Sequence, residues 1–306
     1  MKTIIVSGSL AYDRIMNFSE RFSDHILPDK IHTLNVCFQV NGVTENYGGT
    51  AGNIAYALRL MGAAPLVSAT IGNDHHKYFQ WLDHHGIERS GIRIIDEELT
   101  AGAYITTDTA NNQITGFNPG AMKHSSQLNL SRFDPANTLL LVSPGNLDDM
   151  IGYPRQAARL GIDYVFDPGQ ALPMLKAEDL LETIGKAFLL IVNDYEFNLI
   201  QDKTGLDEAG LLALARTTIV TLGGEGSRIH GPQGVVDIPA FTARRVVDPT
   251  GAGDAYRGGL LSALVQGFDL PSAALRGSAC ASFAVECNGT QVYSFTTEEF
   301  ADRLGR

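Results

Sequence analysis

Residues 247–259 decide the fold of this 306-residue chain and read VDPTGAGDAYRGG. The small residues Gly251, Ala252 and Gly253 stand directly before an apolar helical run that begins near Ala255. The first N–H groups of a helix have no partner within it and lie at the positive end of its dipole. The stretch therefore predicts an anion hole, in which several main-chain N–H groups face one bound anion.

An acidic residue, Asp254, directly follows these small residues, where a bound anion would repel its carboxylate. An acid at such a place needs another role, and a base for a hydroxyl that attacks phosphorus is one. The helix dipole is expected to keep Asp254 ionised at neutral pH, so that it orients the hydroxyl and accepts its proton late. The alternative is a tight turn that Asp254 caps.

A second glycine-rich turn enters an amphipathic helix at residues 47–58, which read YGGTAGNIAYAL. The adjacent Gly48 and Gly49 let a small polar ligand approach the main chain, and Asn53 offers both a donor and an acceptor. Asp13 follows the first predicted strand, where its carboxylate can accept from both hydroxyls of a vicinal diol. The alternatives are an ordinary helix cap at the turn and a turn-forming aspartate at position 13.

Short apolar strands alternate with helical patterns along most of the chain. Continuous apolar strands in this arrangement indicate a mostly parallel sheet covered by helices on both faces. Ligands of such sheets gather at the carboxyl ends of the strands. The predicted strands are 3–6, 65–71, 139–142, 163–166, 188–192 and 219–222, and the predicted helices are 53–61, 148–160, 194–202, 207–216, 255–266 and 272–286.

Two segments break the alternation. Residues 31–40 show a period of two, typical of a half-exposed strand, and residues 102–117 repeat it around a turn at 108–112. Together they predict a small antiparallel sheet inserted into the larger domain, either an edge hairpin or a mobile lid with an apolar underside. The apolar side chains of the first segment are Leu34, Val36, Phe38 and Val40.

The composition excludes several classes of protein. Lys and Arg number 23 against 34 Asp and Glu, which leaves a formal net charge of −11 and predicts neither a nucleic-acid nor a membrane partner. Hydrophobic residues at 44% and charged residues at 19% are typical of a globular protein. Three cysteines without a CxxC pair, together with a very short apolar run at the start, predict a cytoplasmic location.

These motifs resemble those of the ribokinase-like (phosphofructokinase-B type) kinases, which phosphorylate sugars and nucleosides with ATP. The match covers essentially the whole chain, and residues 248–254 are its most specific part. The resemblance implies a three-layer α/β/α fold with a mostly parallel central sheet and a small β-sheet lid inserted from two segments. The implied large domain is 1–13, 47–100 and 123–306, and the implied lid is 14–46 and 101–122.

The resemblance also implies a role for each motif, with Asp254 as the catalytic base and Gly251, Ala252 and Gly253 as the anion hole. Glu196 is expected to act on Mg²⁺ through water, and carbonyls around Asp248 and Thr250 are where a K⁺ ion is expected. The implied acceptor-binding residues are Asp13, Gly48, Gly49, Asn53 and Gln170, with Asp167 as a further pocket candidate. The implied nucleotide-binding residues are Asn193, Glu196, Thr221, Gly223 and Gly226.

The acceptor is less sharply indicated. Residues 8–13, 49–56 and 167–170 resemble the bacterial adenosine or broad nucleoside kinase branch, which implies transfer from Mg-ATP to the 5′-hydroxyl of a ribonucleoside in purine salvage. An apolar lid face of Val36, Phe38 and Ile114 would suit a flat base, and it would equally suit two lids paired in a homodimer. The alternative to the homodimer is a monomer. The alternatives to a nucleoside kinase are a sugar kinase of the same family and a non-catalytic nucleoside-binding module.

Overall fold

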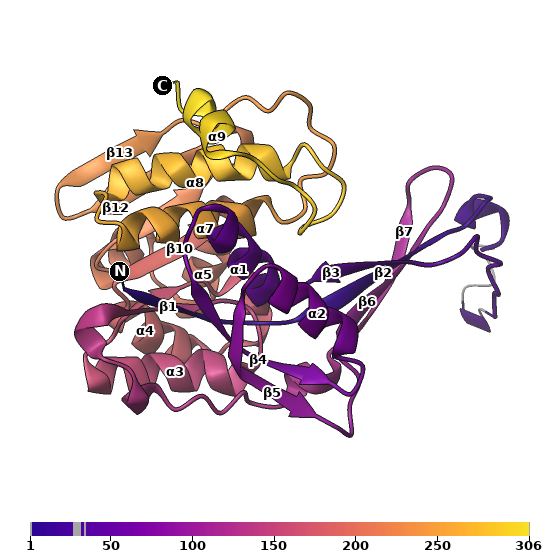
Figure 1. Ribbon diagram of the computed structural model, residues 1–306, viewed down its shortest axis with the longest axis horizontal. Helices are drawn as coiled ribbons and strands as arrows, with labels where there is room; N and C mark the ends of the chain where they lie inside the picture. Colours follow the sequence, from indigo (N-terminus) through magenta and orange to yellow (C-terminus); the bar gives the residue numbers. More distant parts are fainter. Residues whose placement is uncertain (1, 27–31, 34, 306) are drawn as a thin grey trace.

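The computed structural model describes residues 2–26, 32–33 and 35–305, which form two separate sheets with helices packed around the larger one (Figure 1). The strands of the larger sheet are β1 (Thr3–Ser7), β4 (Pro65–Gly72), β5 (Glu88–Ile95), β8 (Thr138–Val142), β9 (Asp163–Phe166), β10 (Leu189–Asn193), β11 (Thr218–Thr221), β12 (Ser227–Gly231) and β13 (Gly234–Ile238). Their order is β13-β12-β11-β10-β9-β8-β1-β4-β5. The strands from β11 to β5 are parallel, and β12 and β13 add an antiparallel edge.

Helices cover both faces of this sheet and make the three layers that the sequence predicts. One face carries α1 (Thr50–Leu60), α2 (His76–His84), α7 (Ala252–Val265), α8 (Leu270–Ala284) and α9 (Thr297–Arg303). The other carries α3 (Leu147–Leu160), α4 (Ala177–Lys186), α5 (Asp194–Thr204) and α6 (Glu208–Leu214). Alternate side chains of β8 enter opposite cores: Leu139 and Leu141 one, Leu140 and Val142 the other. Burial on both faces explains why the strands are continuously apolar.

The sequence pattern predicted the central elements and missed the peripheral ones. Each predicted strand and helix of the large sheet is confirmed, with its ends within a few residues of those observed. The missed elements are β5, β12, β13 and α4. In β5 the exposed Arg89 and Arg93 interrupt the apolar run by which the central strands were recognised. In β13 that run is only two exposed valines followed by an exposed aspartate. Within the described residues, no helix combines the length and apolar character needed to cross a bilayer.

The small sheet extends away from the large one (Figure 1). Its strands are β2 (Ala11–Asn17), β3 (Thr44–Gly48), β6 (Ala101–Thr107) and β7 (Gln113–Asn118), in the order β3-β2-β6-β7. The prediction for residues 102–117 is confirmed, since β6 and β7 form an antiparallel hairpin. The sheet as a whole is mixed rather than antiparallel, because β2 and β6 run parallel.

The strand predicted over residues 31–40 is wrong, although its alternation is real. Among the described residues of this segment, only Val40 pairs, through one bridge to Phe18, and Leu34 lies outside the described residues. Val36 and Phe38 are half-buried while their neighbours are exposed. Phe38 packs on Phe18 and Phe22, with ring centroids 4.9 and 5.0 Å apart. One-sided packing of an extended segment on an aromatic cluster therefore produced the period of two without a ladder of hydrogen bonds.

Candidate active site

The predicted site residues meet at one edge of the large sheet. Asp167 follows β9, Asn193 ends β10 and Thr221 ends β11, while the two glycine-rich turns open α1 and α7. The carboxyl ends of parallel strands lie at the same edge, so residues far apart in the chain become neighbours.

Close packing of α1 on α7 joins the two glycine-rich turns. A Cβ atom at Gly258 would lie 2.3 Å from the Cβ of Ala57, so glycine is required for this approach. The first turns of both helices are thereby brought together, and Asn53 Nδ2 donates to Asp254 Oδ2 at 2.8 Å. An acceptor held by the first turn would lie beside the carboxylate of the second.

The protonation of Asp254 depends on opposing effects. Its side chain is half-buried, and loss of hydration raises its pKa from 3.8 to about 7. The hydrogen bond from Asn53 and the charge of Arg257 lower the pKa, and the charge of Asp167 raises it. Burial therefore opposes the ionisation that the helix dipole is expected to favour at neutral pH. A pKa near the working pH is the value that suits a general base.

The start of α7 offers main-chain donors to an anion. Gly251 is the N-cap residue with a left-handed φ of 77°, and a Cβ there would lie 2.8 Å from Thr290 Cγ2. The N–H of Ala252 donates to the Pro249 carbonyl at 3.2 Å. The N–H groups of Gly251, Gly253 and Asp254 have no acceptor within the described part of the chain. Of the predicted anion hole, Gly251 and Gly253 therefore offer free donors and Ala252 does not, while Asp254 adds a donor that was not predicted.

A buried ion pair that could not be read from the sequence holds this turn through the carbonyl of Gly253. Arg257 Nη2 donates to Asp167 Oδ1 at 2.6 Å, and Nη1 donates to the Gly253 carbonyl at 3.0 Å. Arg257 and Asp167 are 7% and 2% exposed. The carboxylate of Asp167, predicted as a pocket residue, is therefore occupied by its ion pair with Arg257. The only sequence signal was the position of Arg257 within the quoted stretch, one helical turn after Gly253.

Two of the predicted acceptor-binding residues, Gly48 and Gly49, lie next to Asp13 or its strand. A Cβ at Gly48 would lie 2.6 Å from Asp13 Oδ2, and one at Gly49, where φ is 88°, would lie 2.5 Å from the Ser9 carbonyl oxygen. Burial raises the pKa of Asp13. Among the described residues, none donates a hydrogen bond to this carboxylate, which leaves both oxygens for a ligand. Gln170 is exposed in a 3-10 helix, Gly169–Met174, and makes no contact that ties it to this group.

The strand register shows which side chains share a face with Asp13. Asp13 lies opposite Asn46 and Ala103, and Ala103 lies opposite Phe117. Opposed residues lie on one face of a sheet, so the aromatic ring on this face is Phe117, which is 55% exposed.

The predicted members of the apolar underside are therefore wrong for Ile114 and Phe38, although the Asp13 face does carry the apolar Ile15, Ile105 and Phe117. Ile114 lies opposite Thr106, which lies opposite Met16, so its side chain is on the face away from Asp13. Phe38 is packed in the aromatic cluster beyond β2. A shift of one residue along a strand reverses the face, and the sequence alone did not fix that register.

The motif Asn193-Asp-Tyr-Glu196 forms a capping box at the start of α5. Asn193 Oδ1 accepts from the N–H of Glu196 at 2.7 Å, and Glu196 Oε2 accepts from the N–H of Asn193 at 2.9 Å. Burial raises the pKa of Glu196, although the hydrogen bond from Asn193 opposes it. In the described ranges, no cluster of three acidic, His or Cys residues could hold a metal by itself. A Mg²⁺ ion here would take its other ligands from phosphate and water.

The remaining nucleotide-site predictions fall on the end of β11 and the one turn that connects it to β12. Thr221 Oγ1 donates to the Val192 carbonyl at 3.3 Å, and Gly223 and Gly226 both have positive φ. A Cβ at Gly226 would lie 2.1 Å from the carbonyl oxygen of Ile238, so this turn requires glycine.

The predicted cation site is tied into the protein by main-chain donors. Asp248 accepts from the N–H of Thr250 at 2.9 Å and from that of Gly289 at 3.2 Å. Both of its oxygens thus hold the loop together, and K⁺ binding stays a prediction.

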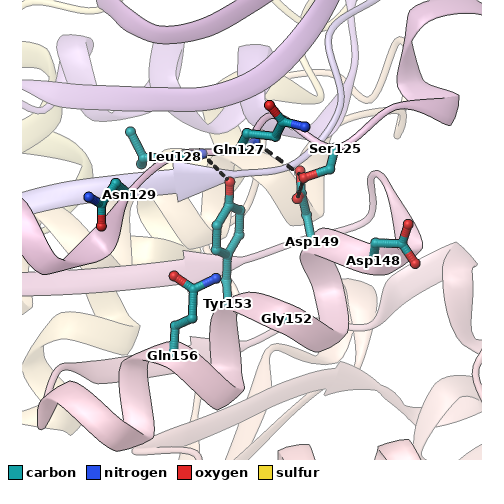
Figure 2. Close-up of a pocket in the computed structure, with 9 residues that line it drawn as sticks. All are labelled: Ser125, Gln127, Leu128, Asn129, Asp148, Asp149, Gly152, Tyr153 and Gln156. Atoms are coloured by element: carbon teal, nitrogen blue, oxygen red, sulfur yellow. Dashed lines mark hydrogen bonds between the residues drawn. The ribbon is translucent and has the colours of Figure 1, made fainter.

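A separate hollow of about 370 Å³ lies beside α3 (Figure 2). Asp149 accepts from the N–H and the hydroxyl of Ser126, both at 2.8 Å, and the Tyr153 hydroxyl accepts from the N–H of Leu128 at 2.8 Å. These buried polar groups satisfy one another, and α3 packs on the face of the sheet opposite to α7. The hollow is therefore not the candidate site.

Comparisons with known proteins show what the whole chain is similar to. A model of the pfkB family of carbohydrate kinases matches residues 3–297. The nucleoside kinase of Methanocaldococcus jannaschii is 34% identical over 307 residues, which cover 99% of this chain and 97% of that protein. The ligand-free nucleoside kinase of Burkholderia thailandensis has a TM-score of 0.88 at 39% identity, covering 99% and 100% of the two chains. Its complex with ADP-inosine has a TM-score of 0.84 at 39% identity, covering 99% and 95%.

Proposed function

This chain belongs to the pfkB family of carbohydrate kinases, and we propose that it is a nucleoside kinase that transfers the γ-phosphoryl group of ATP to the 5′-hydroxyl of a ribonucleoside. The observation that carries the proposal is the 2.8 Å hydrogen bond between Asn53 and Asp254. It joins the turn suited to ribose hydroxyls to the carboxylate at the anion hole. Full-length similarity to two nucleoside kinases, one of them in complex with ADP-inosine, supports this acceptor and ATP as the donor.

Acceptor binding is assigned to the turn around Asp13. Its unpartnered carboxylate accepts from the two ribose hydroxyls, and the absence of a side chain at Gly48 leaves room beside that carboxylate. Phe117, on the same face of the small sheet, offers its exposed ring to the base. Closure of the small sheet over the acceptor excludes water from the reaction. The division of the chain into a large domain and a lid, and a homodimer through that lid, stay predictions.

The transfer itself needs a base and stabilisation of charge. In its ionised form Asp254 accepts the proton of the 5′-hydroxyl as that oxygen bonds to the γ-phosphorus. The bond from this phosphorus to the bridging oxygen breaks, and ADP carries away the electron pair. The amides of Gly253 and Asp254 donate to the phosphoryl oxygens, and the charge of Arg257 lies directly behind them. Most of the rate enhancement comes from this positioning.

Magnesium fits the site only as part of a nucleotide complex. Glu196 Oε2 is held by the Asn193 N–H, which leaves Oε1 to face a hydrated ion. A bound Mg²⁺ neutralises the phosphate charge that develops during transfer.

A mass-spectrometric assay tests the proposed function. The purified protein is incubated with Mg-ATP and a panel of ribonucleosides, ribose and fructose, and the products are screened for the mass of one added phosphate. We expect ribonucleosides to be modified and the Asp254→Asn variant to give almost no product. Phosphorylation of the free sugars alone would identify a sugar kinase. Binding of nucleosides without any transfer would identify the non-catalytic alternative.

A further inference from the structure

A chain of directional hydrogen bonds lies behind the candidate base. The Nε1–H of Trp81 donates to Gln291 Oε1 at 2.8 Å. Gln291 Nε2 donates to Asn53 Oδ1 at 2.9 Å and to the Tyr78 hydroxyl oxygen at 3.1 Å. Asn53 Nδ2 then donates to Asp254 at 2.8 Å. The four side chains that lead to Asp254 come from three separate parts of the fold: α1, α2 and the segment between α8 and α9.

Each bond in the chain has only one possible direction. The indole N–H of Trp81 is a donor without acceptor capacity, so it selects the oxygen of the Gln291 amide. The Tyr78 hydroxyl donates to the Gly48 carbonyl at 2.6 Å, so it is an acceptor toward Gln291. The Gln291 amide nitrogen must therefore face Asn53 and bind its oxygen. This leaves the nitrogen of Asn53 to face Asp254.

We propose that Gln291 is a positioning residue for phosphoryl transfer, which holds the Asn53 side chain so that it donates to the Asp254 carboxylate. The inference rests on the proposed function and adds to it residues that touch neither substrate nor nucleotide. Gln291 is only 1% exposed, and both ends of its amide are hydrogen-bonded. A buried amide with every bond satisfied has one stable orientation, since a flip would place donors against donors.

The packing around Gln291 supports a specific role. A Cβ at Gly52 would lie 2.0 Å from the Tyr78 hydroxyl oxygen and 2.9 Å from Gln291 Nε2. Glycine at position 52 is thus required by the hydrogen-bonded side chains that pack against it. Trp81 is itself fixed by stacking on Tyr47, with ring centroids 4.7 Å apart. The anchor of the chain is therefore rigid.

The pKa of Asp254 depends on nearby charged groups as well as on the hydrogen-bonded side chains behind it. Arg257 on α7 favours the ionised carboxylate, and Asp167 after β9 opposes it. The phenol of Tyr293 is the other described titratable group that interacts with Asp254; burial raises its pKa, so it stays neutral. Gln291 acts on none of these groups directly. Its effect on Asp254 must pass through the hydrogen bond from Asn53, which favours the ionised form.

A double-mutant cycle tests this route. Gln291→Met keeps the volume and removes the amide, so the acid limb of the kcat–pH profile should move up by about one pH unit. At a pH well below the pKa of Asp254, such a shift lowers kcat roughly tenfold, and a higher pH restores kcat. The KM for ATP should be unchanged. In an Asn53→Ala background the same substitution should not move the limb further. An equal movement in both backgrounds would overturn the proposal.

Two further variants separate positioning from folding. Trp81→Phe keeps the stacked ring and loses only the indole donor, so it should move the acid limb in the same direction by a smaller amount. Gln156→Met, on α3 in the remote hollow of Figure 2, is the matched control and should leave the profile unchanged. If Gln291→Met fails to fold, a Trp81→Phe profile identical to that of the wild-type protein contradicts the proposal.

A readout without catalysis distinguishes this inference from the proposed function. The carboxyl carbon of Asp254 is titrated by NMR in ¹³C-labelled protein, with its signal assigned by its loss in Asp254→Asn. We expect a higher pKa for Asp254 in Gln291→Met than in the wild-type protein. The same pKa in both proteins overturns the positioning role whatever the substrate. Absence of nucleoside phosphorylation by the wild-type enzyme would instead overturn only the proposed function.

Discussion

The two carboxylates of the candidate site, Asp254 and Asp13, differ in how the protein holds them. Burial raises the pKa of both. Asp254 is fixed by Asn53 and faces the Arg257–Asp167 pair, whereas no described residue donates to Asp13. The first is organised before any ligand arrives, and the second completes its hydrogen bonds only with an acceptor. In the proposed function, the large sheet and its helices would thus supply the chemistry, and the small sheet would supply recognition of the acceptor.

The largest expected effect is the loss of turnover when the carboxylate of Asp254 is removed. Asp254→Asn keeps the shape and removes the base, so kcat should fall by about 10²- to 10⁴-fold while nucleoside affinity is nearly unchanged. Steady-state kinetics and calorimetry measure the two quantities. Asp148→Asn, an exposed aspartate on α3, is the matched control and should retain full kcat. Undiminished turnover in Asp254→Asn would remove the base from the mechanism.

The unpartnered carboxylate should affect binding instead. Asp13→Asn loses a charged acceptor for two hydroxyls, so the Kd for a ribonucleoside should rise about 10- to 100-fold, with a smaller change in kcat. A 2′-deoxyribonucleoside lacks one of the hydroxyls, and the substitution should weaken its binding less. Equal losses for both ligands would show that Asp13 does not bind the diol.

The two faces of the small sheet offer a sharper form of the same comparison. Phe117→Ala removes the ring on the Asp13 face and should weaken nucleoside binding by about tenfold, as for the loss of one base-stacking contact. Ile114→Ala, on the opposite face, should leave the affinity as it is. Calorimetry with inosine as the probe measures both. A larger effect at Ile114 would mean that the acceptor approaches from the other face.

The smallest expected effect is on stability and follows from the sign of the pKa change. The folded-state pKa of Asp254, about 7, is above the value of 3.8 expected for the unfolded chain. The folded protein thus binds this proton more tightly, and Asp254 destabilises the fold increasingly as pH rises from 4 to 7. Asp254→Asn should therefore raise Tm by a few degrees at pH 8 and change it little at pH 4. Thermal unfolding at both pH values, with Asp148→Asn as the control, checks this difference.

Local patterns were enough to predict the six central strands of the large sheet and both glycine-rich turns. The strands from β11 to β4 are buried on both faces, so each reads as an apolar run without reference to its partners. The turn at residues 248–254 is recognisable because its anion-binding character comes from adjacent residues, the small residues at the start of one helix. The strand predicted over 31–40 was wrong because one-sided packing and strand pairing produce the same period of two.

The contacts that organise the site could not be predicted, because they join distant positions. Asn53 and Asp254 are separated by 201 residues, and Gln291 and Asn53 by 238. Arg257 stood within the quoted stretch, yet its partner Asp167 is 90 residues away. Periodicity and spacing report which side of an element is buried, and they carry no information about which polar groups meet there.

The order of residues alone therefore determined the central strands and helices of this protein and the chemical groups available at the ends of those strands. Folding alone supplies the burial that raises the pKa of Asp254 to about 7, puts Phe117 rather than Ile114 on the face of Asp13, and turns the nitrogen of Asn53 toward Asp254. The physical reason is that helix and strand preferences arise from near neighbours. Desolvation, strand register and the direction of a hydrogen bond depend instead on atoms that folding brings from elsewhere.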